Sequence, residues 1–112
     1  MRLILPLLVL ITCSPTGPDD VEVDWAMVTH YWDMAEAELG ITRFSPDKVS
    51  WTARDGNVLC NGELSYGCFN TNGRITYNVY TPGVIKQEAC HAIKYYNGSK
   101  DWRENCHSAP DN

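Results

Sequence analysis

The sequence predicts a small α+β domain in which two amphipathic helices flank a strand-rich middle. Apolar residues recur with helical spacing over 21–39 and again over 84–96, and between these segments polar and apolar residues alternate. Four cysteines, at positions 60, 68, 90 and 106, can staple a fold of this size. With 112 residues the chain has room for one domain with a modest core.

The first twelve residues predict an export signal that is removed from the mature protein. Arg2 is followed by an apolar run from Leu3 to Ile11, which is too short to span a bilayer and is typical of a secretory signal. Residues 13–20, with two prolines and a glycine, are interpreted as a tether, and 21–112 as a single domain.

The residues at the end of this signal, Leu10-Ile11-Thr12-Cys13, resemble a bacterial lipobox. The resemblance implies that Cys13 is lipidated, becomes the mature N-terminus and anchors the protein to a membrane at the cell surface or in the periplasm. The alternative is ordinary signal cleavage between residues 14 and 17, which would make the protein secreted.

The charge balance limits the choice of partners. The whole chain has a net charge of −5, and without residues 1–12 it has 8 basic and 14 acidic residues, a net of −6. Binding to nucleic acid needs clustered Lys and Arg to neutralise phosphates, so nucleic acid is excluded as a partner. We expect a monomer whose substrate or partner is a peptide or an envelope protein.

The first helix is expected over residues 21–39, with Gly40 as its stop signal. One stripe of this segment is apolar and predicts a core-facing surface to which both tryptophans contribute. Its members are Trp25, Val28, Trp32, Ala35 and Leu39. His30 lies opposite this stripe and is expected to be exposed.

The middle of the chain predicts a small antiparallel sheet made of two hairpins. Alternation over 49–53, the turn Asp55-Gly56 and a return over 58–60 predict the first hairpin. Residues 68–69, the turn Asn72-Gly73 and the alternating run 75–79 predict the second.

The cysteine count supports export to an oxidising compartment. With Cys13 assigned to lipid, four cysteines remain, and three pairings of them are possible. We favour Cys60–Cys68 with Cys90–Cys106, because each bridge closes a local loop beside a predicted turn. The alternative is a structural zinc site made by Cys90, His91, Cys106 and His107, although adjacent helical positions point about 100° apart.

The second helix, 84–96, organises the rest of the domain. Thr81 and Pro82 are typical of a helix start, and Asn97-Gly98 is typical of a helix stop. One face is apolar, and Gln87 and His91 project side by side from the other, with Glu88 beside them.

The run Gln87-Glu88-Ala89-Cys90-His91 resembles the H-E-x-x-H motif of zincin metallopeptidases. The resemblance implies a zinc-dependent hydrolase in which Glu88 is the catalytic base and His91 a zinc ligand, with Gln87 at the degenerate position of the first ligand. It also implies a third ligand downstream, for which His107 is the candidate, with Asp101 and Glu104 favoured as bystanders. The strand 74–80 would be the sheet edge that pairs with substrate.

Three functions follow from this pattern. The first is an exported zincin-like metallopeptidase homologue with weak or no activity, because a neutral amide is a poor zinc ligand beside imidazole. The second is a non-enzymatic envelope lipoprotein that acts as a binding or exclusion module and keeps the scaffold without the chemistry, which Gln87 favours. The alternative for the helix itself is an ordinary amphipathic helix with Gln87, Glu88 and His91 on the side that faces water. The third, and least favoured, is a thiol enzyme that uses Cys90 and His91.

Overall fold

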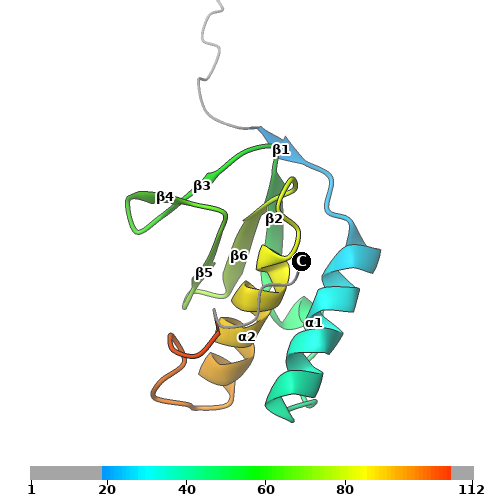
Figure 1. Ribbon diagram of the computed structural model, residues 1–112, viewed down its shortest axis with the longest axis vertical. Helices are drawn as coiled ribbons and strands as arrows, with labels where there is room; N and C mark the ends of the chain where they lie inside the picture. Colours follow the sequence, from blue (N-terminus) through cyan, green and yellow to red (C-terminus); the bar gives the residue numbers. More distant parts are fainter. Residues whose placement is uncertain (1–18, 107–112) are drawn as a thin grey trace, which may run out of the picture.

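Two helices lie side by side against a four-stranded sheet in the computed structural model, which describes residues 19–106 (Figure 1). The chain is thus a small α+β domain, as the sequence predicts. Along the chain the elements are β1 (Asp20–Val21), α1 (Trp25–Leu39), the 3₁₀ turn η2 (Pro46–Lys48), β2 (Ser50–Arg54), β3 (Val58–Cys60), β4 (Glu63–Ser65), β5 (Gly67–Asn70), β6 (Arg74–Asn78) and α2 (Val84–Tyr96). Within the described part, no helix is long and apolar enough to cross a membrane.

The main sheet has the order β1-β2-β6-β5 and mixes parallel and antiparallel pairs. The predicted second hairpin is confirmed: β5 and β6 are antiparallel, and Gly73 in the turn has a φ of 93°, which favours glycine. The predicted first hairpin is wrong. β2 pairs in parallel with β6 and antiparallel with β1, whereas β3 forms a separate hairpin with β4.

The pairing of β2 explains why the local turn signal at Asp55-Gly56 did not produce a hairpin. Both edges of β2 are already occupied, one by β6 and the other by β1, and the Asp55 N–H continues that ladder to the Asp19 carbonyl at 3.1 Å. The parallel register also places Ala53 beside Tyr77, and both side chains are 1% exposed in the core. Burial of the sheet centre therefore outweighs the two-residue turn.

The position of β6 corrects a second expectation. The strand 74–80 was expected at the sheet edge, but β6 lies between β2 and β5. The edge next to α2 is instead β5. Its residue Gly67 approaches α2 so closely that an added Cβ would lie 2.9 Å from a Val84 methyl and 3.0 Å from Glu88 Cγ.

Helix α1 begins at Trp25, four residues later than the sequence predicts, because residues 20–21 form β1. The Asp24 side chain accepts a hydrogen bond from the Met27 N–H at 3.1 Å, and Gly40 ends the helix with a φ of 70°. Trp32 is fully buried, but Trp25 is 53% exposed, so only one of the two tryptophans belongs to the core. His30 is exposed, as expected.

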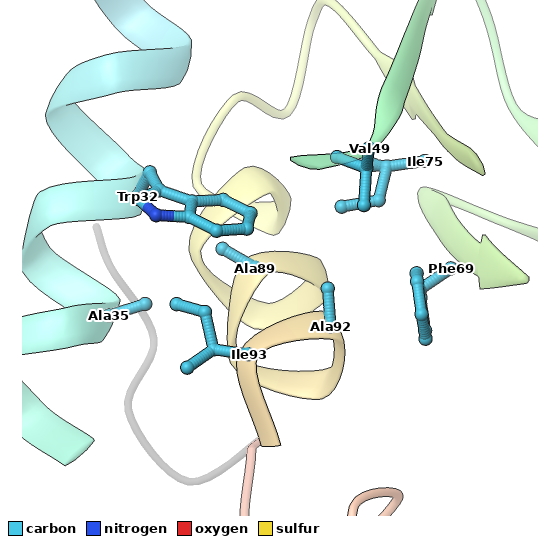
Figure 2. Close-up of a cluster of buried hydrophobic side chains, with 8 residues drawn as sticks. All are labelled: Trp32, Ala35, Val49, Phe69, Ile75, Ala89, Ala92 and Ile93. Carbon is cyan, nitrogen blue, oxygen red and sulfur yellow. The ribbon is translucent and has the colours of Figure 1, made fainter. Parts of the chain in front are cut away.

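The main core joins both helices to the sheet. Figure 2 shows the Trp32 ring reaching from α1 toward Ala89 of α2, and small alanines on α2 allow this close approach. The cluster consists of Trp32, Ala35, Val49, Phe69, Ile75, Ala89, Ala92 and Ile93. The Trp32 indole N–H donates to the Phe44 carbonyl at 3.1 Å, which satisfies the polar atom of this buried ring.

Two disulfides hold the domain, Cys60–Cys68 and Cys90–Cys106, in the pairing favoured from the sequence. The first ties β3 to β5, and the second ties α2 to the segment after it. Because Cys90 and Cys106 are joined to each other, the alternative zinc site with both thiolates is contradicted. The thiol-enzyme hypothesis fails for the same reason, since Cys90 holds no free thiol.

The ends of α2 agree only partly with the sequence. Gly98 follows the helix with a φ of 84°, as the stop signal predicts. The expected cap at Thr81 is wrong: the helix begins at Val84 after a tight turn, and the Thr81 hydroxyl donates to the Asn78 carbonyl. Tight i to i+3 bonds from residues 84–86 take the place of a side-chain cap.

Candidate functional site

Glu88 and His91 are both buried, with 5% and 7% of their surfaces exposed. This contradicts the ordinary amphipathic helix, whose polar residues would face water. Nine of the thirteen residues of α2 are buried, because α1, the sheet and the segment after the helix all cover it. A carboxyl and an imidazole on such a helix carry a desolvation cost that surface residues avoid.

Glu88 and His91 line one cavity of about 350 Å³. Its wall is built from α2, the edge strand β5, the β3–β4 hairpin and the segment after α2. The other lining residues are Cys60, Asn61, Ser65, Gly67, Phe69, Asn70, Thr71, Trp102 and Arg103. The cavity is therefore lined by a sheet edge, by the titratable side chains of Glu88 and His91, and by Arg103.

The pKa of Glu88 is raised from 4.5 to about 7. Burial is the main cause, and a hydrogen bond from the Phe69 main chain lowers the pKa in part. Because that N–H belongs to the edge strand, the Glu88 carboxyl lies against the main chain of β5. Near neutral pH the group is balanced between a carboxylate that accepts and a carboxylic acid that can also donate.

The main chain of β5 faces the cavity at alternate residues. The Asn78 N–H donates to the Tyr66 carbonyl at 2.8 Å, so the ladder to β6 uses Tyr66 and every second residue after it. The N–H groups of Gly67 and Phe69 then point away from β6, and the Ser65 hydroxyl donates to the Gly67 carbonyl at 2.9 Å. Ser65 Oγ accepts weakly from Gly67, at 3.4 Å, and Glu88 accepts from Phe69.

His91 is held by the segment after α2. Its Nδ1 lies 2.9 Å from the Trp102 carbonyl oxygen, which can only accept, so Nδ1 carries the proton. The other ring nitrogen, Nε2, is therefore the one with a lone pair when the ring is neutral. The Trp102 ring packs edge-on against the imidazole, with centroids 6.2 Å apart.

Asp101 and Glu104 belong to this same segment after α2. Both are exposed, and neither lines the cavity. The buried Lys94 ammonium donates to the Glu104 carbonyl at 2.6 Å and lies 3.8 Å from the Asp101 carboxylate. These contacts hold the segment on α2, which agrees with the bystander interpretation.

The zinc ligands that the resemblance implies are not assembled within residues 19–106. No group of three or more His, Cys, Asp or Glu side chains in that range could hold a metal ion. Gln87, one turn before His91, is half-buried and is not among the described residues that line the cavity. A catalytic zinc needs three protein ligands, and within residues 19–106 the cavity is lined by the imidazole of His91 and the carboxyl of Glu88. His107 and Cys13, the expected lipidation site, lie outside the described residues.

Sequence reasoning missed the part of the site that comes from outside α2. Arg103 and Ser65 line the cavity, and no motif or spacing pointed to them. The Cys90–Cys106 pairing was the one available signal for Trp102 and Arg103, because it predicts that their segment folds back on α2. Comparisons with family models, with curated proteins and with solved structures found no match to this chain.

Proposed function

We propose that this chain is an exported, lipid-anchored zincin-like metallopeptidase homologue whose cavity binds an extended peptide and no longer hydrolyses it. The observation that carries the proposal is the burial of Glu88 and His91 together in one cavity beside the edge strand β5. Their spacing is that of the second half of H-E-x-x-H, and an ordinary amphipathic helix would leave both in water.

Peptide binding is supported by the main chain of β5. A strand edge offers unpaired N–H and C=O groups to an added extended chain, and pockets between them select side chains. Here the added chain would replace Glu88 as the partner of the Phe69 N–H. It would also replace the Ser65 hydroxyl as the partner of the Gly67 carbonyl. A protonated Glu88 competes less well for that N–H, so we expect the cavity to bind peptide more tightly below pH 7 than above it.

The loss of hydrolysis follows from the donor set. Gln87 supplies a neutral amide where the motif needs an imidazole, and the described residues bring no other histidine to the cavity. His30 is exposed on α1 and does not line it. The proposed function thus combines the two functions expected from the sequence: a peptidase homologue that works as a binding module.

A pool of labelled ten-residue peptides and two tryptophan variants test the proposal. Thr71 lines the cavity, so Thr71→Trp should fill part of it and weaken the binding of pool peptides at least tenfold, by fluorescence anisotropy. Thr42→Trp adds the same ring at an exposed site away from the cavity and should bind as wild type does. Equal binding by both variants, no binding by wild type, or zinc-dependent cleavage of the pool by wild type would overturn the proposal.

A further inference from the structure

Six large apolar side chains are exposed in the described part of the chain, and they gather at one end of the domain. Their exposed fractions reach 73% at Tyr80, 72% at Leu64 and 68% at Leu59. The full set is Val21, Trp25, Leu59, Leu64, Tyr66 and Tyr80. Apolar side chains scattered singly are ordinary on a protein surface, but a group of this size at one end indicates an interaction surface.

Strand pairing and hydrogen bonds place three of these residues, Val21, Tyr66 and Tyr80, around the carboxyl ends of β2 and β6. Val21 pairs with Ala53 near the end of β2. The parallel partner of that strand end is Asn78 of β6. Asn78 donates its N–H to the Tyr66 carbonyl at 2.8 Å, and its side-chain oxygen accepts from the Tyr80 N–H at 2.8 Å.

The other three exposed residues, Leu59, Leu64 and Trp25, lie at the same end of the domain. Asn78 also donates its side-chain N–H to Asn57 Oδ1 at 2.8 Å, at the start of the β3–β4 hairpin. Leu59 and Leu64 are direct partners across that hairpin and therefore share one of its faces. Figure 1 shows β1, the hairpin and the start of α1, where Trp25 lies, in the same half of the molecule.

We propose that this end of the domain, defined by Val21, Trp25, Leu59, Leu64, Tyr66 and Tyr80, docks on the surface of a lipid bilayer made of zwitterionic lipids. The inference rests on the lipid anchor at Cys13 in the proposed function. Asp19 is only six positions after Cys13, a reach of about 20 Å at full extension. Because Asp19 bonds to Asp55 at this end, the anchor would hold these side chains at the membrane.

The residue types fit an interface rather than a hydrocarbon core. Trp and Tyr favour the headgroup level, where the ring is apolar and its N–H or O–H stays hydrated. Two neighbouring leucines can reach the acyl boundary below it. The same end carries acidic residues, among them Asp19, Asp55 and Glu63, and the chain is acidic overall, so anionic lipids should weaken docking.

Docking also orients the candidate site. The cavity lies between β5, α2 and the β3–β4 hairpin, so the hairpin joins the membrane-facing end to the cavity wall. With the hairpin seated on lipid, the ends of both helices at Gly40 and Gly98 would point away from the membrane (Figure 1). The cavity would then open close to the bilayer, toward peptides at its surface.

Quenching by brominated lipid tests the proposal on the full-length, lipidated protein reconstituted in phosphatidylcholine vesicles. Bromine on the acyl chains should quench tryptophan fluorescence in wild type. The quenched fraction should disappear in Trp25→Phe and persist in Trp51→Phe, a matched change at a half-buried ring that packs on the core near the other end of β2. Vesicle-bound protein whose fluorescence is not quenched, or is quenched equally in both variants, overturns the proposal.

A second measurement separates docking from anchoring. In full-length Cys13→Ser, which cannot carry the lipid, the double variant Leu59→Asn with Leu64→Asn should bind phosphatidylcholine vesicles roughly tenfold or more weakly than its parent. Thr42→Asn on the same background should change nothing. Cys13→Ser could instead form dimers as its concentration rises, and Leu59→Asn with Leu64→Asn could abolish them. That result would show that the apolar end binds a second copy of the chain, and it would overturn docking on lipid. If only the proposed lipid anchor is wrong, wild type and Cys13→Ser should be recovered in the membrane fraction in equal amounts.

Discussion

The His91 imidazole donates its Nδ1 proton to the Trp102 carbonyl across 2.9 Å, and this hydrogen bond links α2 to the segment that follows it. Metal-binding histidines in proteins use the same kind of support, because a bond at one ring nitrogen fixes the tautomer and aims the other. The Cys90–Cys106 disulfide closes a stretch of 16 residues around that bond. The position of His91 therefore depends on a covalent bridge as well as on packing.

Removal of this bridge should affect stability and the His91 ring together. Cys90→Ala with Cys106→Ala should lower the free energy of unfolding by about 3 kcal/mol, the cost expected for a loop of this size, measured by urea denaturation. It should also shift the nitrogen chemical shifts of the His91 ring. Cys60→Ala with Cys68→Ala is the matched control and should destabilise the domain without altering the His91 tautomer. Unchanged His91 shifts in the first variant would contradict the link.

The raised pKa of Glu88 predicts that stability falls as the pH rises. A carboxyl whose pKa is about 7 in the folded protein and 4.5 as a free group binds its proton more tightly when folded. The free energy of unfolding should therefore decrease between pH 4.5 and 7, by roughly 3 kcal/mol in all, and level off above pH 7. His91 and Arg103 line the same cavity as this carboxyl.

Glu88→Gln tests this dependence directly. The amide keeps the shape and can still accept from the Phe69 N–H, but it does not titrate in this range. The variant should lose most of the slope between pH 4.5 and 7 and be more stable than wild type at pH 8, by urea denaturation at each pH. Glu63→Gln, at an exposed position, should keep the slope. A wild-type slope that survives in Glu88→Gln would refute the assignment.

The close approach of β5 to α2 predicts a large effect from one methyl group. Gly67→Ala would place Cβ 2.9 Å from a Val84 methyl and 3.0 Å from Glu88 Cγ, so the strand or the helix must shift. We expect a loss of about 1–3 kcal/mol in thermal or chemical denaturation. Gly62→Ala is a control for glycine loss in general, because Gly62 has a positive φ but nothing within 4 Å. An equal or smaller loss at position 67 would disprove the tight contact.

The sequence predicted the elements with strong periodicity and missed those decided by long-range pairing. Helical spacing found both helices, and Asn72-Gly73 correctly marked the β5–β6 hairpin. Asp55-Gly56 is an equally strong turn signal, yet β2 pairs with β6 because Ala53 and Tyr77 bury each other under the helices. Pairing between segments this far apart leaves no local pattern, so turn chemistry alone could not find it.

The candidate site also has a part that local sequence pattern predicted and a part that depends on long-range packing. Glu88 and His91 were found because one helix carries both at a recognisable spacing. Their burial was not predicted, since it comes from the sheet, from α1 and from the segment bridged to Cys90. The contact between Glu88 and the Phe69 main chain depends on which strand forms the sheet edge, and the parallel placement of β6 moved that edge to β5.

The proposed lipid anchor at Cys13 is tested by fractionation. Wild type expressed with its own signal should be recovered in the membrane fraction, because a lipidated Cys13 inserts acyl chains, and Cys13→Ser should shift most of the protein to the soluble fraction. Ser14→Ala, next to the lipidated position, is the control and should stay in the membrane. Wild type found wholly in the soluble fraction would favour ordinary signal cleavage instead.

Gln87→His should restore the donor set of the motif on a helix that is already formed. Positions 87 and 91 are one turn apart on α2, and Gln87 is half-buried, so an imidazole can be accommodated there without loss of the core contacts of Ala89 and Ile93. The His91 ring is already supported through Nδ1, which leaves Nε2 as its ligating nitrogen. We expect zinc binding near one equivalent after equilibration in metal-replete buffer, against less than a tenth for wild type, by elemental analysis. Gln87→Asn changes the same position without adding an imidazole and should bind no more zinc than wild type. If Gln87→His folds, as judged by its melting curve, yet binds no more zinc than Gln87→Asn, the resemblance to the zincin helix is superficial and Glu88 has only a structural role.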